Sequence, residues 1–158
     1  MKDKWNSRRS TLASAMLLVF SSLPAGASGG LWCNIDDANL KLNVESGVTH
    51  GMGGPFFNFK ASAELLAKDV ADDFRHLTLD NKLVHSWLDG DETRLLLYVE
   101  REGGKPFGSV EILIETSGDR EEIDLKGTYE VSYFEAARQQ GDNTGLVKII
   151  GDVTCGGE

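Results

Sequence analysis

The sequence has few of the residue types that bind metals or act as nucleophiles. It contains 3 histidines, 2 cysteines and 3 methionines in 158 residues. It has no Gly-x-Ser-x-Gly or His-Glu-x-x-His motif, and neither cysteine has a neighbouring base. The acidic pairs do not follow the spacing of a twelve-residue calcium loop. These absences favour a protein that is not an enzyme and that carries no metal or cofactor.

Positive charge is also scarce. The first 27 residues hold 4 of the 16 basic residues and 1 of the 25 acidic ones, which leaves 12 basic and 24 acidic residues in 28–158, a formal charge of −12. No two of those basic residues are adjacent. Nucleic acid and anionic membranes both attract a concentrated positive field. We therefore exclude both as partners and expect a cationic partner or a small ligand.

The first 27 residues have the pattern of a secretory signal peptide. A basic segment precedes a short apolar stretch, Thr11–Leu23, and Ala25-Gly26-Ala27 is a cleavage site before Ser28. The apolar stretch is too short to span a bilayer as a helix. We expect a periplasmic or secreted protein whose single domain is 28–158. Ser7-Arg8-Arg9 leaves both the general secretory route and the twin-arginine route open.

Only two cysteines, Cys33 and Cys155, remain at the two ends of that domain. Each has the parity of apolar neighbours in an extended segment, so both side chains are expected on the apolar side of terminal strands. In an oxidising compartment such a pair predicts one disulfide. Closing so long a loop stabilises the folded state by about 4–5 kcal/mol in the chain-entropy model.

Short segments of alternating polarity, separated by Gly, Asp and Asn, indicate an all-β fold. No strand–helix–strand rhythm interrupts them. We predict an antiparallel β-sandwich or small β-barrel of about eight strands. The expected strands are Leu31–Ile35, a segment from Asn39 to Val48, Phe56–Leu65, Phe74–Leu79, the two arms of Leu83–Val99, Phe107–Thr116, Ile123–Tyr133 and Leu146–Cys155.

The hairpin Leu83–Val99 is predicted to run through the middle of the core. Its second arm, Leu95–Val99, is apolar at every position, which is typical of a strand covered on both faces. On the same reasoning we interpret Trp87, and likewise Trp32, as buried. His76 and His85, each alone in a strand, are interpreted as packed core residues.

The most site-like stretch is the glycine-rich loop Gly47–Pro55. Four glycines in nine residues allow close approach of backbone to a ligand, and the loop carries His50 and Met52 and is followed by Phe56 and Phe57. We predict a ligand-binding site of these four side chains. A flexible connection without function is the competing interpretation. In the strand that follows, we expect Phe57 on the same face as Phe59, Ala61, Ala63 and Leu65.

The function predicted from the sequence is that of an exported, non-enzymatic binding domain for a protein or small ligand. Two alternatives stay open. One is an inhibitor of a basic hydrolase such as a lysozyme, because a small acidic β-domain closed by a disulfide resembles the periplasmic lysozyme inhibitors in overall plan, although it lacks their inhibitory-loop motifs. The other is a small periplasmic hydrolase whose carboxylates are assembled across strands.

Overall fold

The computed structural model describes residues 29–49, 55–89, 92–118, 124–140 and 144–157. Within those ranges the chain forms nine strands and two single-turn 3₁₀ helices, and no helix there is long and apolar enough to cross a membrane. The strands are β1 Gly29–Asp36, β2 Leu40–Val48, β3 Phe56–Leu65, β4 His76–Thr78, β5 Leu83–Asp89, β6 Glu92–Glu100, β7 Gly108–Ser117, β8 Asp124–Glu135 and β9 Leu146–Gly157, with η1 at Asp72–Phe74 and η2 at Ala136–Arg138.

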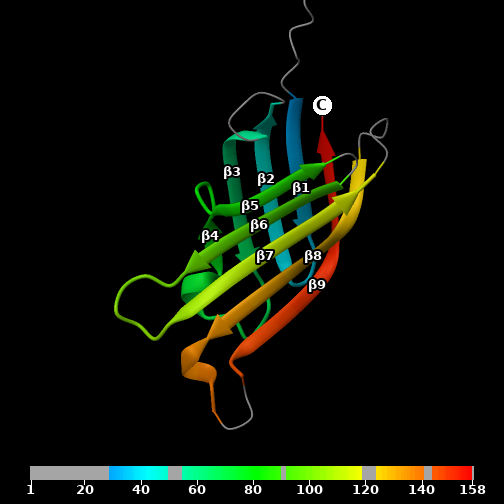
Figure 1. Cartoon of the computed structure of the whole chain (residues 1–158). Coiled ribbons are helices and arrows are strands. Elements are labelled where there is room, and N and C mark those ends of the chain that lie inside the picture. Colours follow the sequence, from blue (N-terminus) through cyan, green and yellow to red (C-terminus); the bar gives the residue numbers. More distant parts are fainter. Residues whose placement is uncertain (1–28, 50–54, 90–91, 119–123, 141–143, 158) are drawn as a thin grey trace, which may run out of the picture.

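All nine strands belong to one antiparallel sheet in the order β4-β3-β2-β1-β9-β8-β7-β6-β5. The first and last strands pair at its middle, so β4 and β5 are its two edges. The sheet curls into a half-barrel, and β5–β8 cross obliquely over β1–β4 (Figure 1). The all-β prediction is therefore confirmed, with nine strands in a single curled sheet.

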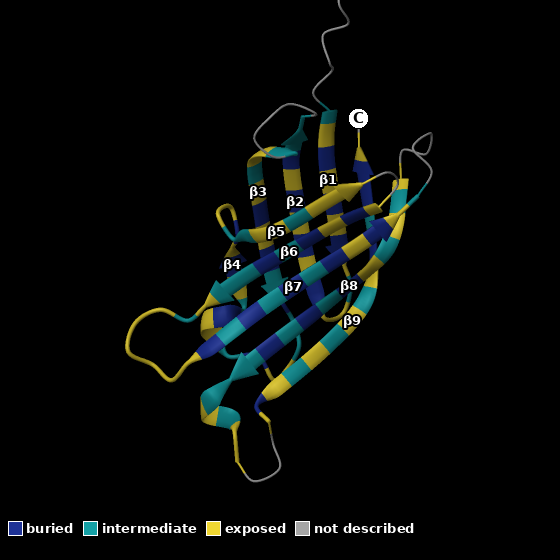
Figure 2. Cartoon of the chain, in the orientation of Figure 1, coloured by how far each residue is buried: buried dark blue, intermediate teal, exposed yellow. Residues whose placement is uncertain are grey.

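The core lies between the two halves of the curled sheet. Alternate residues of β2, Leu40, Leu42 and Val44, are at most 2% exposed, and the residues between them are exposed. The other half contributes Ile112, Val131 and further residues to the same apolar cluster. The bands along each strand in Figure 2 show this alternation. The period-two pattern of the sequence thus assigned most of the inward faces correctly.

Cys33 and Cys155 form the predicted disulfide. They face each other across β1 and β9, and both are fully buried. The bond joins positions 122 residues apart in the chain, at the place where the two halves of the sheet meet. The matching parity of the two cysteines predicted this pairing because each lies on the inward face of its strand.

The hairpin Leu83–Val99 does not run through the middle of the core. β5 is an edge strand that is largely exposed along its length (Figure 2). In β6 the two faces also differ: Leu95 and Leu97 are at most 1% exposed, whereas Leu96 and Tyr98 are half-buried. The apolar run of β6 is therefore covered on one face only, because the other half of the sheet packs against that face alone.

The predicted burial of both tryptophans and two histidines was also wrong. Trp32 is 38% and Trp87 50% exposed, and His76 and His85 are exposed. Trp32 alternates with the inward-facing Cys33 and therefore lies on the outer face, where its ring covers Gly156 on the neighbouring strand. A Cβ at Gly156 would lie 2.3 Å from the Trp32 ring, so only glycine leaves room for it.

Candidate functional site

Two of the four predicted ligand-binding residues lie within the described part of the chain. Phe56 and Phe57 begin β3, whereas His50 and Met52 fall outside the described residues. Phe56 is half-buried, and Phe57 is 41% exposed. Exposure of a large aromatic side chain on a strand is a specific feature to explain, because most of a phenylalanine's surface is normally removed from water.

A bulge in β3 turns Phe57 to the outer face. Between two regular pairings, Glu45 with Lys60 and Gly47 with Phe57, β3 has one residue more than β2. Asn58 within this bulge has φ 52°, in the left-handed region that asparagine tolerates better than most residues. Because the side-chain period of a strand is two, one extra residue reverses the facing of everything before it.

The prediction that Phe57 shares the inward face of Phe59 and Ala61 was therefore wrong. Its ring lies on the outer face above Gly47, where an added Cβ would be 2.2 Å from the Phe57 ring carbon Cζ. Phe56 now takes the inward position and packs against the core together with Phe59. One strand thus presents aromatic side chains to both of its faces within four residues.

These rings line a hollow of about 460 Å³ between the start of β3 and the turn that leads into β5. We call it the aromatic hollow. Its residues are Phe56, Phe57, Asn58, Phe59, Asp80, Asn81 and Leu83. Apolar and polar groups are combined: three phenylalanines and a leucine form the apolar part, and two amides and one carboxylate supply the polar groups. Such a combination accepts a ligand with an apolar body and a few polar atoms.

Asp80 is the charged residue of the hollow, and its position is fixed. Its Oδ1 accepts a hydrogen bond from the backbone N–H of Ala61 at 3.1 Å, which ties the turn after β4 to β3. The backbone N–H of Lys82 donates to the carbonyl of Leu79 across the same turn. In the sequence, Asp80-Asn81 lies in the short interval between the expected strands Phe74–Leu79 and Leu83–Val99, and nothing there placed this turn beside Phe57.

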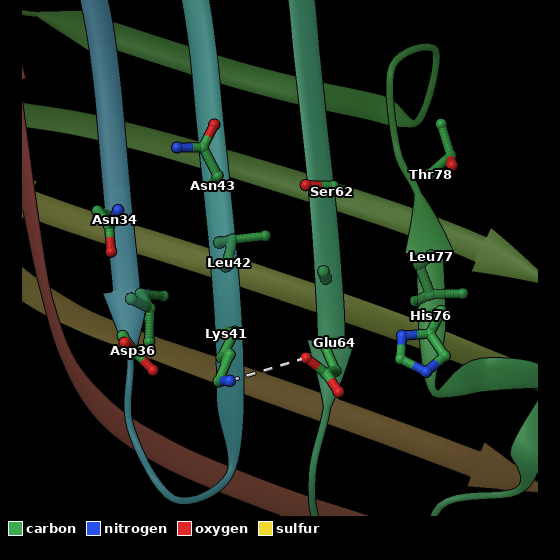
Figure 3. Close-up of a pocket in the computed structure, with 12 residues that line it drawn as sticks. Asn34, Asp36, Lys41, Leu42, Asn43, Ser62, Glu64, His76, Leu77 and Thr78 are labelled. Atoms are coloured by element: carbon green, nitrogen blue, oxygen red, sulfur yellow. Dashed lines mark ion pairs between the residues drawn. The ribbon is translucent and has the colours of Figure 1, made fainter.

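A second hollow, about 490 Å³, lies on the outer face of β1–β4 (Figure 3). Neutral side chains from four adjacent strands stand in one row, Asn34, Asn43, Ser62 and Thr78. A parallel row carries ionisable side chains: Asp36, Lys41, Glu64 and His76. Lys41 Nζ and Glu64 are 4.0 Å apart and both exposed, so this ion pair contributes little stability.

This outer row bears on the alternative of a hydrolase assembled across strands. Asp36 on β1 and Glu64 on β3 lie on one face of the sheet, but β2 separates their strands and the Lys41 ammonium stands between their positions. Asp36 is exposed and Glu64 is half-buried. The hydrolase alternative stays a prediction from the sequence.

Another charged cluster, centred on the buried side chain of Arg101, holds the connection before β4. The Arg101 side chain, 5% exposed, binds Asp73 at 2.7 Å and Glu135 at 2.7 Å, and its guanidinium lies 4.9 Å from the centre of the Phe74 ring. The hydrogen bond from Arg101 lowers the pKa of Asp73. The pKa of Glu135 is lowered first by a hydrogen bond from Tyr133 and then by Arg101. Each side-chain oxygen and nitrogen of Arg101, Asp73 and Glu135 has a hydrogen-bond partner within the protein. We therefore interpret this cluster as structural and call it the clasp.

Metal-binding groups are not gathered in the described part of the chain. No cluster of three or more His, Cys, Asp or Glu side chains suited to a metal ion occurs among the described residues. His50 and Met52 place an imidazole and a thioether two residues apart in the sequence, a pairing that suits copper(I), and both residues lie outside the described part of the chain.

Comparison with known proteins adds no family. No protein-family model, no curated protein and no solved structure matches the chain.

Proposed function

We propose that this chain is an exported, non-enzymatic binding domain and that the aromatic hollow is its binding site. The observation that carries the proposal is the Asn58 bulge, which exposes Phe57 beside Phe56, Phe59 and Leu83. Burying a phenylalanine side chain stabilises a complex by up to about 1.5–3 kcal/mol. A ligand that covers Phe57 would gain part of this free energy. The disulfide supports the export, because such bonds persist in oxidising compartments.

The ligand we propose is an apolar group that carries a positive charge or a hydrogen-bond donor. The amides of Asn58 and Asn81 and the carboxylate of Asp80 provide acceptors, and the faces of aromatic rings attract cations. The domain's formal charge of −12 favours a cation at long range as well. The group can belong to a small molecule or to a side chain of a basic protein, the partner class that includes basic hydrolases.

The first experiment compares two small probes of similar shape and opposite charge. Phenethylamine and 3-phenylpropionate are titrated separately into the mature protein while its backbone amide resonances are followed by NMR. We expect phenethylamine to shift the resonances of Asn58, Asn81 and Leu83 and to bind at least about tenfold more tightly than the anion. Equal binding of the two probes, or shifts confined to another surface, would contradict the proposal.

A matched pair of variants then connects the hollow to a natural partner. Phe57→Ser removes the exposed ring of the hollow, and Phe107→Ser removes a ring that is similarly exposed, 48% against 41%, at a different place. Both tagged variants are used to capture partners from a periplasmic extract. We expect Phe57→Ser to lose a partner that the wild type and Phe107→Ser retain, with all three proteins showing similar thermal midpoints. Equal capture by both variants would place the site elsewhere.

A further inference from the structure

β5 is an edge strand without a strand on its outer side among the described residues. It pairs with β6 alone, through a ladder that shifts register between Leu83 and His85. Regular pairing therefore begins at His85 and continues to Asp89. An edge of this kind presents unpaired backbone N–H and C=O groups, which can pair with a further strand.

The side chains of this edge are unusually apolar for an exposed strand. Val84, Trp87 and Leu88 are 57%, 50% and 36% exposed. The strand has no lysine and no proline, two residue types that commonly prevent edge strands from pairing with other chains. Apart from the charge of Asp89 at its end, its only such device is the bulge at Val84, which lies outside the regular stretch. The features that usually block association are thus missing from His85 to Leu88.

The charges of this stretch are complementary to themselves. His85, Trp87 and Asp89 share the outer face, because they lie opposite Leu96, Arg94 and Glu92, which alternate with the inward-facing Leu95 and Thr93. In an antiparallel pair of two β5 strands centred on Trp87, residue 85 of each copy lies opposite residue 89 of the other. Each imidazole then faces a carboxylate, to which it can donate a hydrogen bond whether it is neutral or charged.

We propose that β5 pairs with β5 of a second copy of this chain, antiparallel and centred on Trp87. The interface is the same on both copies, as a two-fold symmetric dimer requires. The two Trp87 rings meet at the symmetry axis, and two His85–Asp89 pairs flank them. Both copies carry a net negative charge, which opposes association at long range, so the dimer gains affinity as salt screens that repulsion.

Two charge variants test this register. His85→Asp places a carboxylate opposite Asp89, and Asp89→Lys places an ammonium opposite His85, so each variant should weaken its own homodimer by at least about tenfold. An equimolar mixture restores a favourable contact at both pairs, because the new carboxylate of one variant faces the new ammonium of the other and the second pair keeps its native His85 and Asp89. Native mass spectrometry distinguishes the heterodimer by mass, and analytical ultracentrifugation measures affinity. Asp36→Lys, the same charge change at an exposed residue of β1, is the control.

The expected result is a dimeric wild type and control, two monomeric single variants and a heterodimer in their mixture. A monomeric wild type at about 100 μM, a concentration at which even weak specific interfaces associate, would overturn the proposal. Dimers of equal affinity in all variants would also overturn it, because the interface would then lie away from β5. Two monomeric variants that do not form a heterodimer would exclude the Trp87-centred register.

Discussion

The two edges of the sheet are built differently. β4 has three residues, and the segments around it are tied to the rest of the protein: Leu65 N–H donates to Arg75 C=O, and Leu79 N–H donates to Ala61 C=O. The buried Arg101 binds Asp73, just before β4. β5 has seven residues and, within the described part of the chain, only β6 beside it. The charged residue nearest its exposed centre, Arg94, is itself half-exposed and pairs with Glu92 and Glu115.

This difference shows that one sheet can have a closed edge, which is protected from pairing with another chain, and an open edge, which is available for such pairing. A very short edge strand, whose flanking segments are hydrogen-bonded to the rest of the protein, offers little unpaired backbone to a strand of another chain. A longer edge with exposed Trp87 and Leu88 offers both backbone and apolar surface. Stability should therefore depend strongly on the residues around β4, whereas residues on the outer side of β5 should contribute chiefly to association.

The largest expected effect comes from the clasp before β4. Arg101→Met keeps much of the side-chain length but removes the hydrogen bonds of the guanidinium to Asp73 and Glu135 and leaves Asp73 only the exposed Lys105 as a cation, which costs about 1.5–3 kcal/mol. Arg94→Met, beside β5, should cost less than about 1 kcal/mol because its partners are exposed. Urea unfolding measures both free energies. Equal losses would mean that the two edges do not differ in this respect.

A smaller effect is expected on acidification. The pKa values of Asp73 and Glu135 are lowered in the folded protein, so both carboxylates stabilise it at pH values above their unfolded pKa. This stabilisation begins to be lost as the pH falls below their unfolded pKa values, about 4, and is lost completely below their lowered folded values. Because Arg101 lowers both pKa values, the stability of Arg101→Met should fall less steeply with acid than that of the wild type. Urea unfolding at a series of pH values provides the measurement. Parallel curves for the two proteins would contradict the role of the clasp.

The smallest effect on folding is expected at the open edge. Trp87→Thr replaces an exposed aromatic residue with another good strand former, so the free energy of unfolding should change by less than about 0.5 kcal/mol. The measurement is made at the lowest usable protein concentration, where association does not contribute. A loss of about 2 kcal/mol or more would show that Trp87 belongs to the core after all.

The sequence predicted the features that depend on local alternation. Leu40, Leu42 and Val44 follow a strict period of two, and the parity of Cys33 and Cys155 placed both on the inward face. Phe57 was misplaced because the reversal at Asn58 comes from one unpaired residue, which alternation cannot reveal. An asparagine inside an aromatic strand was the available signal, since asparagine tolerates a positive φ.

The position of β5 was mispredicted for a different reason. Leu83–Leu88 contains as many apolar residues as an inner strand, and whether such a strand is central depends on which other strands pair beside it. That order is set by the pairing of β1 with β9, far apart in the chain, which places the ends of the sequence in the middle of the sheet and leaves β5 at the margin. The candidate site was predicted only in part for the same reason, because Asp80, Asn81 and Leu83 reach Phe57 through the tertiary fold.

The disulfide also determines how the domain would respond to mechanical tension. β1 begins and β9 ends at the same margin of the molecule, so a force that separates these two ends would unzip their ladder one pair at a time (Figure 1). Among the described residues, the Leu31–Gly157 and Trp32–Gly156 pairs alone precede the Cys33–Cys155 pair. Beyond them the tension passes through a covalent bond, and the segment between the two cysteines, which lie 122 positions apart in the sequence, bears none of it. In the oxidised protein, a force applied to the two ends of the described chain therefore does not reach the half-barrel or its aromatic hollow. Reduction of the disulfide lets that force reach both.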